Sequence, residues 1–202
     1  MKYILASSSP RREKMLSMFD IEIEYIKHLF DEKSISLEKC PREYSKNISR
    51  GKGKSISNNY KNFTIISADT IVLLDNEILE KPRNKADAIN MLKLLSGREH
   101  VVITGVCLIC ESKSINFSFH EETIVKFKKL DIDEIEYYVD RYNPLDKSGS
   151  YGIQDFSSIF VKSIDGCFFN VVGLPLFSVF YHLKRLKLLH FSLNSNNRIN
   201  KL

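Results

Sequence analysis

Residues 66–82 read ISADTIVLLDNEILEKP, and this stretch decides the fold. An apolar run meets one acid, Asp69, resumes, turns at Asp75-Asn76 and returns toward Lys81, which predicts a strand, a charged break and a hairpin. A carboxylate between apolar strand segments is costly to bury unless it is paired or meets a metal, so we expect Asp69 at a strand end that opens into a cleft. With Lys81 on the returning strand, the hairpin suits a site for a metal and a polyanion. A structural Asp–Lys pair at the hairpin mouth fits the same pattern.

A second anion-binding feature lies near the amino terminus. Tyr3 to Ala6 predicts a short strand that runs directly into the segment SSSPRR, residues 7–12. Ser9 is a typical N-cap and Pro10 a typical first helical residue, so a helix begins there. Two arginines in a first turn oppose the helix dipole, and an anion bound by them, by the hydroxyl groups and by the free N–H groups would offset that conflict. The segment predicts a phosphate site; two solvated arginines are the alternative.

Three other segments carry polar side chains that could reach the same cleft. Asp31 and Glu32 lie in a polar loop, where simple surface charge is the alternative. Lys52 lies in a basic helix that begins at Pro41, although most such lysines are solvated. A glycine-punctuated loop over residues 145–154 ends in Gln154, whose amide both donates and accepts and therefore suits a nucleobase edge. A plain turn is the competing interpretation of that loop.

The remaining pattern predicts the fold class. Apolar strands alternate with amphipathic helices, and one long antiparallel section lies in the middle of the chain. This predicts a mixed α/β fold, a twisted sheet flanked by helices. Strands are expected at 22–26, 101–110, 115–127, 158–164 and 167–172, and helices at 84–97, 131–142 and 176–189.

Composition narrows the class of protein. The chain has 202 residues, of which 43% are hydrophobic and 27% charged, which is typical of a globular protein. The net charge is +5, but the whole surplus of basic residues follows Asp165 and no helix forms a basic stripe, which argues against nucleic-acid binding. We expect one domain over residues 1–190 and a basic, disordered tail over 191–202. The five histidines show no metal-ligand spacing, and none is assigned chemistry.

Two features of the sequence bear on where the protein is located in the cell. Apolar runs all fall well short of the roughly 20 residues that span a bilayer. The first residues lack the long apolar region of a signal peptide. We therefore expect a cytoplasmic protein without a membrane partner.

Taken together, six segments resemble the Maf family of nucleoside triphosphate pyrophosphatases. They occur in the family's order and spacing, which makes the signal far more specific than any single motif. The segments are LASSSPRR at 5–12, SADT at 67–70, EKP at 80–82, LSGREH at 95–100, SYGIQ at 150–154 and NVVGLPL at 170–176. The resemblance covers the chain from Leu5 to about Leu183.

The resemblance implies hydrolysis of a nucleoside triphosphate to the monophosphate and pyrophosphate with Mg²⁺ or Mn²⁺. It implies an elongated, two-lobed fold with a central cleft, similar to the inosine triphosphate pyrophosphatases, and usually a homodimer. Asp69 would be the general base and, with Glu32, the metal-linked acid. The substrate-binding residues would be Ser7, Ser9, Arg11, Arg12, Lys52, Thr70, Lys81 and Gln154.

Within this set, Arg11, Thr70 and Gln154 match the positions typical of the subgroup that acts on dTTP, UTP and modified pyrimidine nucleotides. Gly51 and Gly53 stand where the family commonly has helix formers, so we expect a looser helix around Lys52. Two alternatives stay open. One is a 7-methyl-GTP pyrophosphatase, and the other is a non-catalytic nucleotide sensor that regulates cell division.

Overall fold

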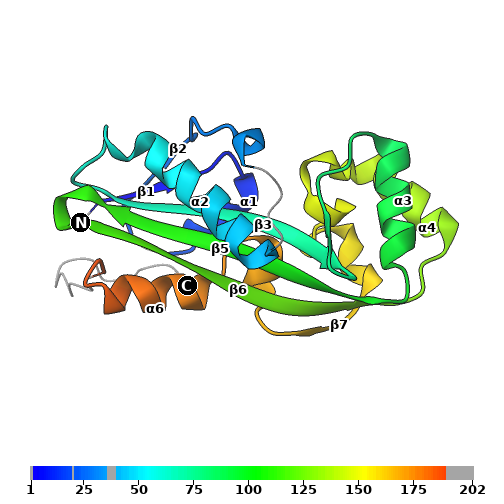
Figure 1. The fold of residues 1–202 in the computed structure, drawn as a ribbon. Coiled ribbons are helices and arrows are strands. Elements are labelled where there is room, and N and C mark those ends of the chain that lie inside the picture. Colours follow the sequence, from blue (N-terminus) through cyan, green and yellow to red (C-terminus); the bar gives the residue numbers. More distant parts are fainter. Residues whose placement is uncertain (1, 20, 36–39, 190–202) are drawn as a thin grey trace, which may run out of the picture.

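The computed structural model describes residues 2–19, 21–35 and 40–189 (Figure 1). Within these residues seven strands form one sheet in the order β2-β1-β3-β5-β6-β7, with β4 paired to β3. The strands are β1 (Tyr3–Ala6), β2 (Ile23–Ile26), β3 (Thr64–Leu74), β4 (Glu77–Leu79), β5 (Glu99–Cys110), β6 (Ile115–Phe127) and β7 (Val161–Asp165). The helices are α1 (Pro10–Leu16), α2 (Pro41–Ser57), α3 (Lys85–Leu95), α4 (Ile132–Tyr142), α5 (Phe168–Val172) and α6 (Leu176–Arg185). The tail predicted over 191–202 lies outside the described residues.

The sheet is mixed, as the alternation of strands and helices predicted. Strand β1 runs parallel to β2 and β3, whereas β3, β4, β5, β6 and β7 pair antiparallel. The long strands β3, β5 and β6 run through both ends of an elongated molecule (Figure 1). At one end α2 and α6 cover opposite faces of the sheet, and at the other end α3 and α4 pack together (Figure 1). The predicted two-lobed α/β fold is therefore confirmed. No described helix combines the length and the apolar character that crossing a bilayer requires.

Strand β3 corrects the expectation for Asp69. The strand continues without a break through Asp69, and the hairpin turn follows at Asp75 and Asn76, both with positive φ as predicted for this turn. Asp69 and its neighbour Thr70 are the two adjacent half-buried residues of an otherwise mostly buried strand. Successive strand residues point to opposite faces, so these two side chains leave the sheet on opposite sides. Asp69 thus reaches the cleft from the middle of a strand, at the junction of the two lobes.

Two predictions near the carboxyl-terminal end were wrong. Residues 168–172 form the short helix α5, not a strand, and residues 156–160 form a 3₁₀ turn, so β7 begins only at Val161. A short apolar run does not distinguish strand from helix by periodicity. The buried amide of Asn170 decides it, because its Nδ2 donates to the Val102 carbonyl and to Thr123 Oγ1, both at 3.0 Å. The last helix, α6, ends at Arg185, four residues before the predicted end.

Glycines let α2 lie directly on the sheet. The helix is unbroken through Gly51 and Gly53, contrary to the expectation of a looser helix. A Cβ at Gly105 of β5 would lie 2.3 Å from the carbonyl carbon of Ser45 in α2. A Cβ at Gly53 would lie 2.8 Å from Ser67 Oγ of β3. The missing side chains therefore bring the helix close enough for its side chains to reach β3.

We expect Gly105→Ala to destabilise the protein more than Gly51→Ala. The added methyl at 105 meets backbone atoms, which cannot move aside, and overpacking of this kind costs about 1–3 kcal/mol. At 51 the nearest atoms belong to the Phe30 ring, 2.5 Å away, which can rotate. Alanine also favours a helix by about 1 kcal/mol over glycine. Urea unfolding of both variants measures the difference, and equal losses would contradict the close approach at Gly105.

Candidate functional site

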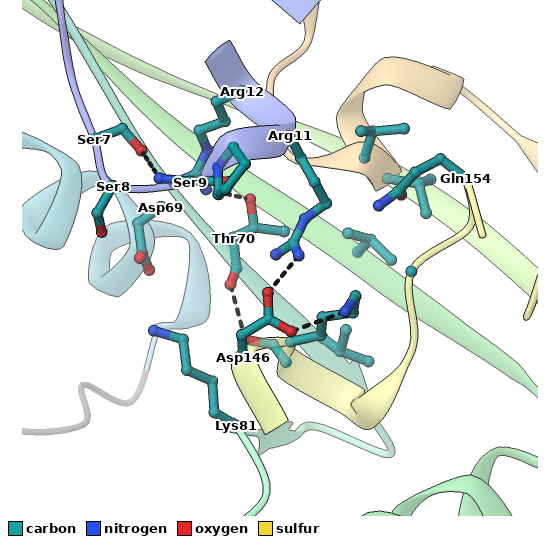
Figure 2. Close-up of a pocket in the computed structure, with 18 of the residues that line it drawn as sticks. Ser7, Ser8, Ser9, Arg11, Arg12, Asp69, Thr70, Lys81, Asp146 and Gln154 are labelled. Carbon is teal, nitrogen blue, oxygen red and sulfur yellow. Dashed lines mark hydrogen bonds and ion pairs between the residues drawn. The ribbon is translucent and has the colours of Figure 1, made fainter. Parts of the chain in front are cut away.

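A cavity of about 220 Å³ lies where the two lobes meet (Figure 2). Helix α1, the middle of β3 and the loop that follows α4 contribute most of its lining. All the residues predicted from the sequence line it, namely Ser7, Ser9, Arg11, Arg12, Glu32, Lys52, Asp69, Thr70, Lys81 and Gln154. The fold thus brings together side chains that are up to 147 positions apart in the sequence. Their individual roles remain predictions.

The centre of the cleft is a buried ion-pair cluster. Lys52 Nζ lies 2.7 Å from Asp69 Oδ1 and 3.1 Å from Glu32 Oε1, and its side chain is only 5% exposed. Lys81, by contrast, is 56% exposed and lies 3.9 Å from Glu32. The cation paired with Asp69 is therefore Lys52 from α2, rather than Lys81 from the hairpin. Lys81 stays accessible for a ligand at the rim.

The acids of this cluster fit one kind of metal site. Glu32 and Asp69 offer carboxylate oxygens, but the described residues contain no group of three His, Cys, Asp or Glu side chains that could hold a metal ion. Mg²⁺ is commonly bound by one or two carboxylates together with water and substrate phosphates. The donor set therefore fits an ion that arrives with a phosphate chain, and does not fit an ion held by the protein alone.

Lysine also controls the charge state of Glu32. Burial alone would raise the pKa of this carboxyl, but Lys52, through charge and a hydrogen bond, and Lys81, through charge, lower it below the ordinary value. Glu32 is therefore an ionised acceptor at neutral pH.

Arg12 is fixed by the opposite face of β3. Its Nε donates to the Gly173 carbonyl at 2.7 Å and its Nη2 donates to Thr70 Oγ1 at 2.9 Å. Thr70 Oγ1 in turn lies 2.9 Å from Thr104 Oγ1. Burial lowers the pKa of Arg12, with Asp69 acting in the opposite direction, but a guanidinium stays charged in proteins. Thr70 therefore orients Arg12, a role that the sequence did not indicate.

The start of α1 matches its prediction in part. The helix begins at Pro10 with Ser9 as N-cap, but the Ser9 side chain makes no capping hydrogen bond. Instead, Ser7 Oγ accepts a hydrogen bond from the Ser9 backbone N–H at 3.1 Å. Both serines line the cavity together with Asp69 (Figure 2). Ser7 thus shapes the turn that leads from β1 into the arginine-bearing helix.

The other end of the cleft contains residues that sequence reasoning missed. Asp146 and Lys147, in the loop after α4, line the cavity with Gln154, and Asp146 pairs with Arg11 (Figure 2). The loop was recognised for its glycines and its glutamine. The adjacent acid and lysine at its start were the available signal. Valines at positions 72, 102, 171 and 172 also line the cavity, and they belong to or pack against the same apolar cluster as Tyr151 and Ile153 of this loop.

Two histidines turn out to belong to the surroundings of the site. His28, whose spacing in the sequence indicated no role, lines the cavity with Nε2 3.7 Å from Glu32 Oε1. Burial and Lys52 lower the pKa of His28, so it is neutral at pH 7. His100 is buried, with Nε2 2.8 Å from Tyr151 Oη, and burial lowers its pKa to about 4. This neutral contact holds the loop that carries Gln154 against β5.

We expect Lys52→Met to lower the free energy of unfolding by about 3 kcal/mol at pH 7, since it leaves the largely buried Asp69 carboxylate without its cation and Glu32 with only the exposed Lys81. The folded pKa of Glu32 lies below its ordinary 4.5, so the stability from this pair is present above that pH and is lost as pH falls through the folded pKa. The difference between wild type and variant should therefore shrink below about pH 4.5. Urea unfolding at pH 7 and pH 4 measures it.

Lys81→Met is the matched control. It removes a cation near the same acid, Glu32, but one that is 56% exposed. Its cost should stay below about 1 kcal/mol at both pH values. Equal costs for the two variants would contradict the assignment of Lys52 as the buried partner.

Several known proteins are similar to this chain in sequence. Residues 2–186 match the family model described as Maf-like protein. A Clostridium botulinum protein named dTTP/UTP pyrophosphatase is 46% identical over 177 residues, covering 87% of this chain and 94% of that relative. A Thermosipho africanus protein of the same name is 47% identical over 179 residues, covering 89% and 90%. Among solved structures, a Mycobacterium abscessus dITP/XTP pyrophosphatase aligns with a TM-score of 0.43 and 11% identity, covering 95% of this chain and 100% of that one.

Proposed function

The chain belongs to the Maf family, and on that premise we propose that it hydrolyses nucleoside triphosphates, dTTP and UTP above all, to the monophosphate and pyrophosphate. The observation that carries the proposal is the cleft itself. A single cavity joins a carboxylate, Asp69, to cations from three separate elements: Arg12, Lys52 and Lys81. A cavity of this composition suits a polyanion that reacts with water.

Arg12 and Lys81 bind the phosphate groups in different ways. A triphosphate carries about four negative charges, which must be countered before water attacks a phosphorus atom. Arg12 is held rigidly by Gly173 and Thr70, so it presents a fixed charge. Lys81 is largely exposed at the rim, so it is free to contact phosphate oxygens. These two groups stabilise the departing pyrophosphate by charge-assisted hydrogen bonds.

Asp69 acts as the general base. Lys52 holds Oδ1, while Oδ2 makes no hydrogen bond to any described residue and is free to accept a proton from the attacking water. The same contact keeps the carboxylate pointing into the cleft, because Lys52 is fixed by its helix.

Glu32 and Asp69 are the residues that would hold a Mg²⁺ or Mn²⁺ ion, which when bound neutralises phosphate charge and makes water more acidic. Both acids are now paired with Lys52. Glu32, which is 38% exposed, has oxygen atoms accessible from the cleft. Lys52 holds the two carboxylates close together, so both remain available as ligands.

We propose that the substrate is a pyrimidine nucleotide and that its base binds at the end of the cavity lined by Gln154. The relatives that match over most of their length are named dTTP/UTP pyrophosphatases. Gln154 lines the end of the cavity that also holds the valines, where an apolar wall and one amide suit a small flat base. The base reader is thus separated from the phosphate-binding cations.

A substrate panel with added Mg²⁺ tests the proposal. Pyrophosphate should be released from UTP and dTTP with the matching monophosphate as co-product. Release of pyrophosphate from 7-methyl-GTP alone would identify the other subgroup. A nucleotide sensor would bind UTP but release no pyrophosphate, and that result would overturn the proposed enzyme.

We expect Asp69→Asn to lower kcat for UTP by about 10²- to 10⁴-fold, because the amide cannot accept the proton from water. UTP affinity should change far less, since the phosphate-binding cations remain. Asp75→Asn is the matched control: Asp75 lies at the end of the same hairpin, is exposed and pairs with Arg98 outside the cavity. Near-normal turnover by Asp69→Asn would refute the role of general base.

A further inference from the structure

One carboxylate holds two cations at the base end of the cleft. Asp146 Oδ2 lies 2.6 Å from Arg11 Nη1, and its Oδ1 lies 2.8 Å from Lys147 Nζ (Figure 2). Arg11 comes from α1, whereas the other two residues come from the loop after α4. The contact therefore joins two sides of the cavity that Gln154 also lines.

Lys147 is built into the wall of the cavity. Its side chain is only 12% exposed, although it lies in a loop. Its stem packs on Gly152, where an added Cβ would lie 2.8 Å from Lys147 Cε. A lysine with a packed stem and one bound carboxylate has its ammonium held in one place. A side chain at position 152 would therefore collide with the lysine stem, which leaves room only for glycine.

Both cations keep spare donors. An ammonium has three N–H groups and a guanidinium has five, and neither accepts a hydrogen bond. In the described residues, Asp146 takes one N–H of Lys147 and one of Arg11. The cluster of two cations and one carboxylate keeps a net positive charge. It therefore offers hydrogen bonds to acceptors and repels donors.

Pyrimidine bases differ in this property. Uracil and thymine carry two ring carbonyl groups, whereas cytosine carries one carbonyl and an amino group in place of the other. A fixed hydrogen-bond donor at the position of the second carbonyl group therefore favours binding of uracil and thymine, which both carry that carbonyl. The amino group of cytosine would meet a donor and a positive charge there. A buried polar group without a hydrogen-bond partner lowers the affinity of a ligand, so such a site discriminates against cytosine.

We propose that Lys147, held by Asp146 beside Arg11, is a specificity-determining residue that selects uracil and thymine nucleotides against cytosine nucleotides. The inference rests on the proposed function and adds to it a residue outside the set predicted from the sequence. Asp146 is the positioning residue, because its two carboxylate oxygens pair with Arg11 and Lys147.

The test is the ratio of kcat/KM for UTP to kcat/KM for CTP, measured by pyrophosphate release in wild type and in Lys147→Met. Methionine keeps an apolar stem over Gly152 but has no donor. The ratio should fall by about tenfold, the effect of one hydrogen bond to a charged group. An unchanged ratio would overturn the inference. An equal fold loss for both nucleotides is one form of that result, and it would place Lys147 at the phosphates or ribose.

Lys85→Met is the matched control. Lys85 lies in the same lobe and its Nζ is 2.7 Å from Asp140, but the pair lies outside the cavity and is exposed. This variant should leave both rates unchanged. Asp146→Ala tests the positioning role and should lower the same ratio while Lys147 itself is intact; an unchanged ratio would remove Asp146 from the proposal.

Failure of this inference differs from failure of the proposed function. A wild-type protein that releases no pyrophosphate from any nucleotide overturns both. A wild-type protein that hydrolyses UTP but gives the same UTP-to-CTP ratio as Lys147→Met overturns the inference alone. Matching thermal unfolding curves for the variants show that the ratio reports on the site and not on folding.

Discussion

A buried ammonium between two carboxylates is the interaction on which the cleft depends. Lys52 Nζ pairs with Asp69 and Glu32 from a position that is almost fully buried. Such a cluster adds little net stability, because desolvation offsets much of the attraction, but removing one partner is costly. Its effect is to fix geometry. An acid in the middle of a sheet strand is tolerated only because α2 delivers a cation to it.

The position of Lys52 beside Asp69 depends on how closely α2 approaches the sheet. Gly53 and Gly105 have no Cβ where the helix meets β3 and β5, and any side chain there would push the helix outward. A loose lysine on a distant helix would have been solvated, as most are. Glycines that weaken a helix on propensity scales are here required by packing, which illustrates how tertiary contacts override local preference.

The two faces of β3 perform different tasks. Asp69 leaves one face toward Lys52, and Thr70 leaves the other toward Arg12. Consecutive residues of one strand therefore position the carboxylate that we propose as the general base and the guanidinium that we propose as a phosphate ligand. At the other end of the cavity, Asp146 joins α1 to the loop after α4. The long strands β3, β5 and β6 join the lobes, and this ion pair links the two sides of the cavity between them.

The sequence by itself determined the mixed α/β fold and the strand-to-helix turn at Pro10, because periodicity and caps are local properties. Its family resemblance also picked out ten of the residues that line the cleft, but neither Asp146 nor Lys147. It did not determine that Asp69 lies within a strand, that residues 168–172 are helical, or that Lys52 and not Lys81 pairs with Asp69. Those outcomes depend on distances between segments remote in the chain. Only the packing of α2, α5 and the loop after α4 on the sheet decided them, since pairing of buried charges and amides is settled by which partners are within reach.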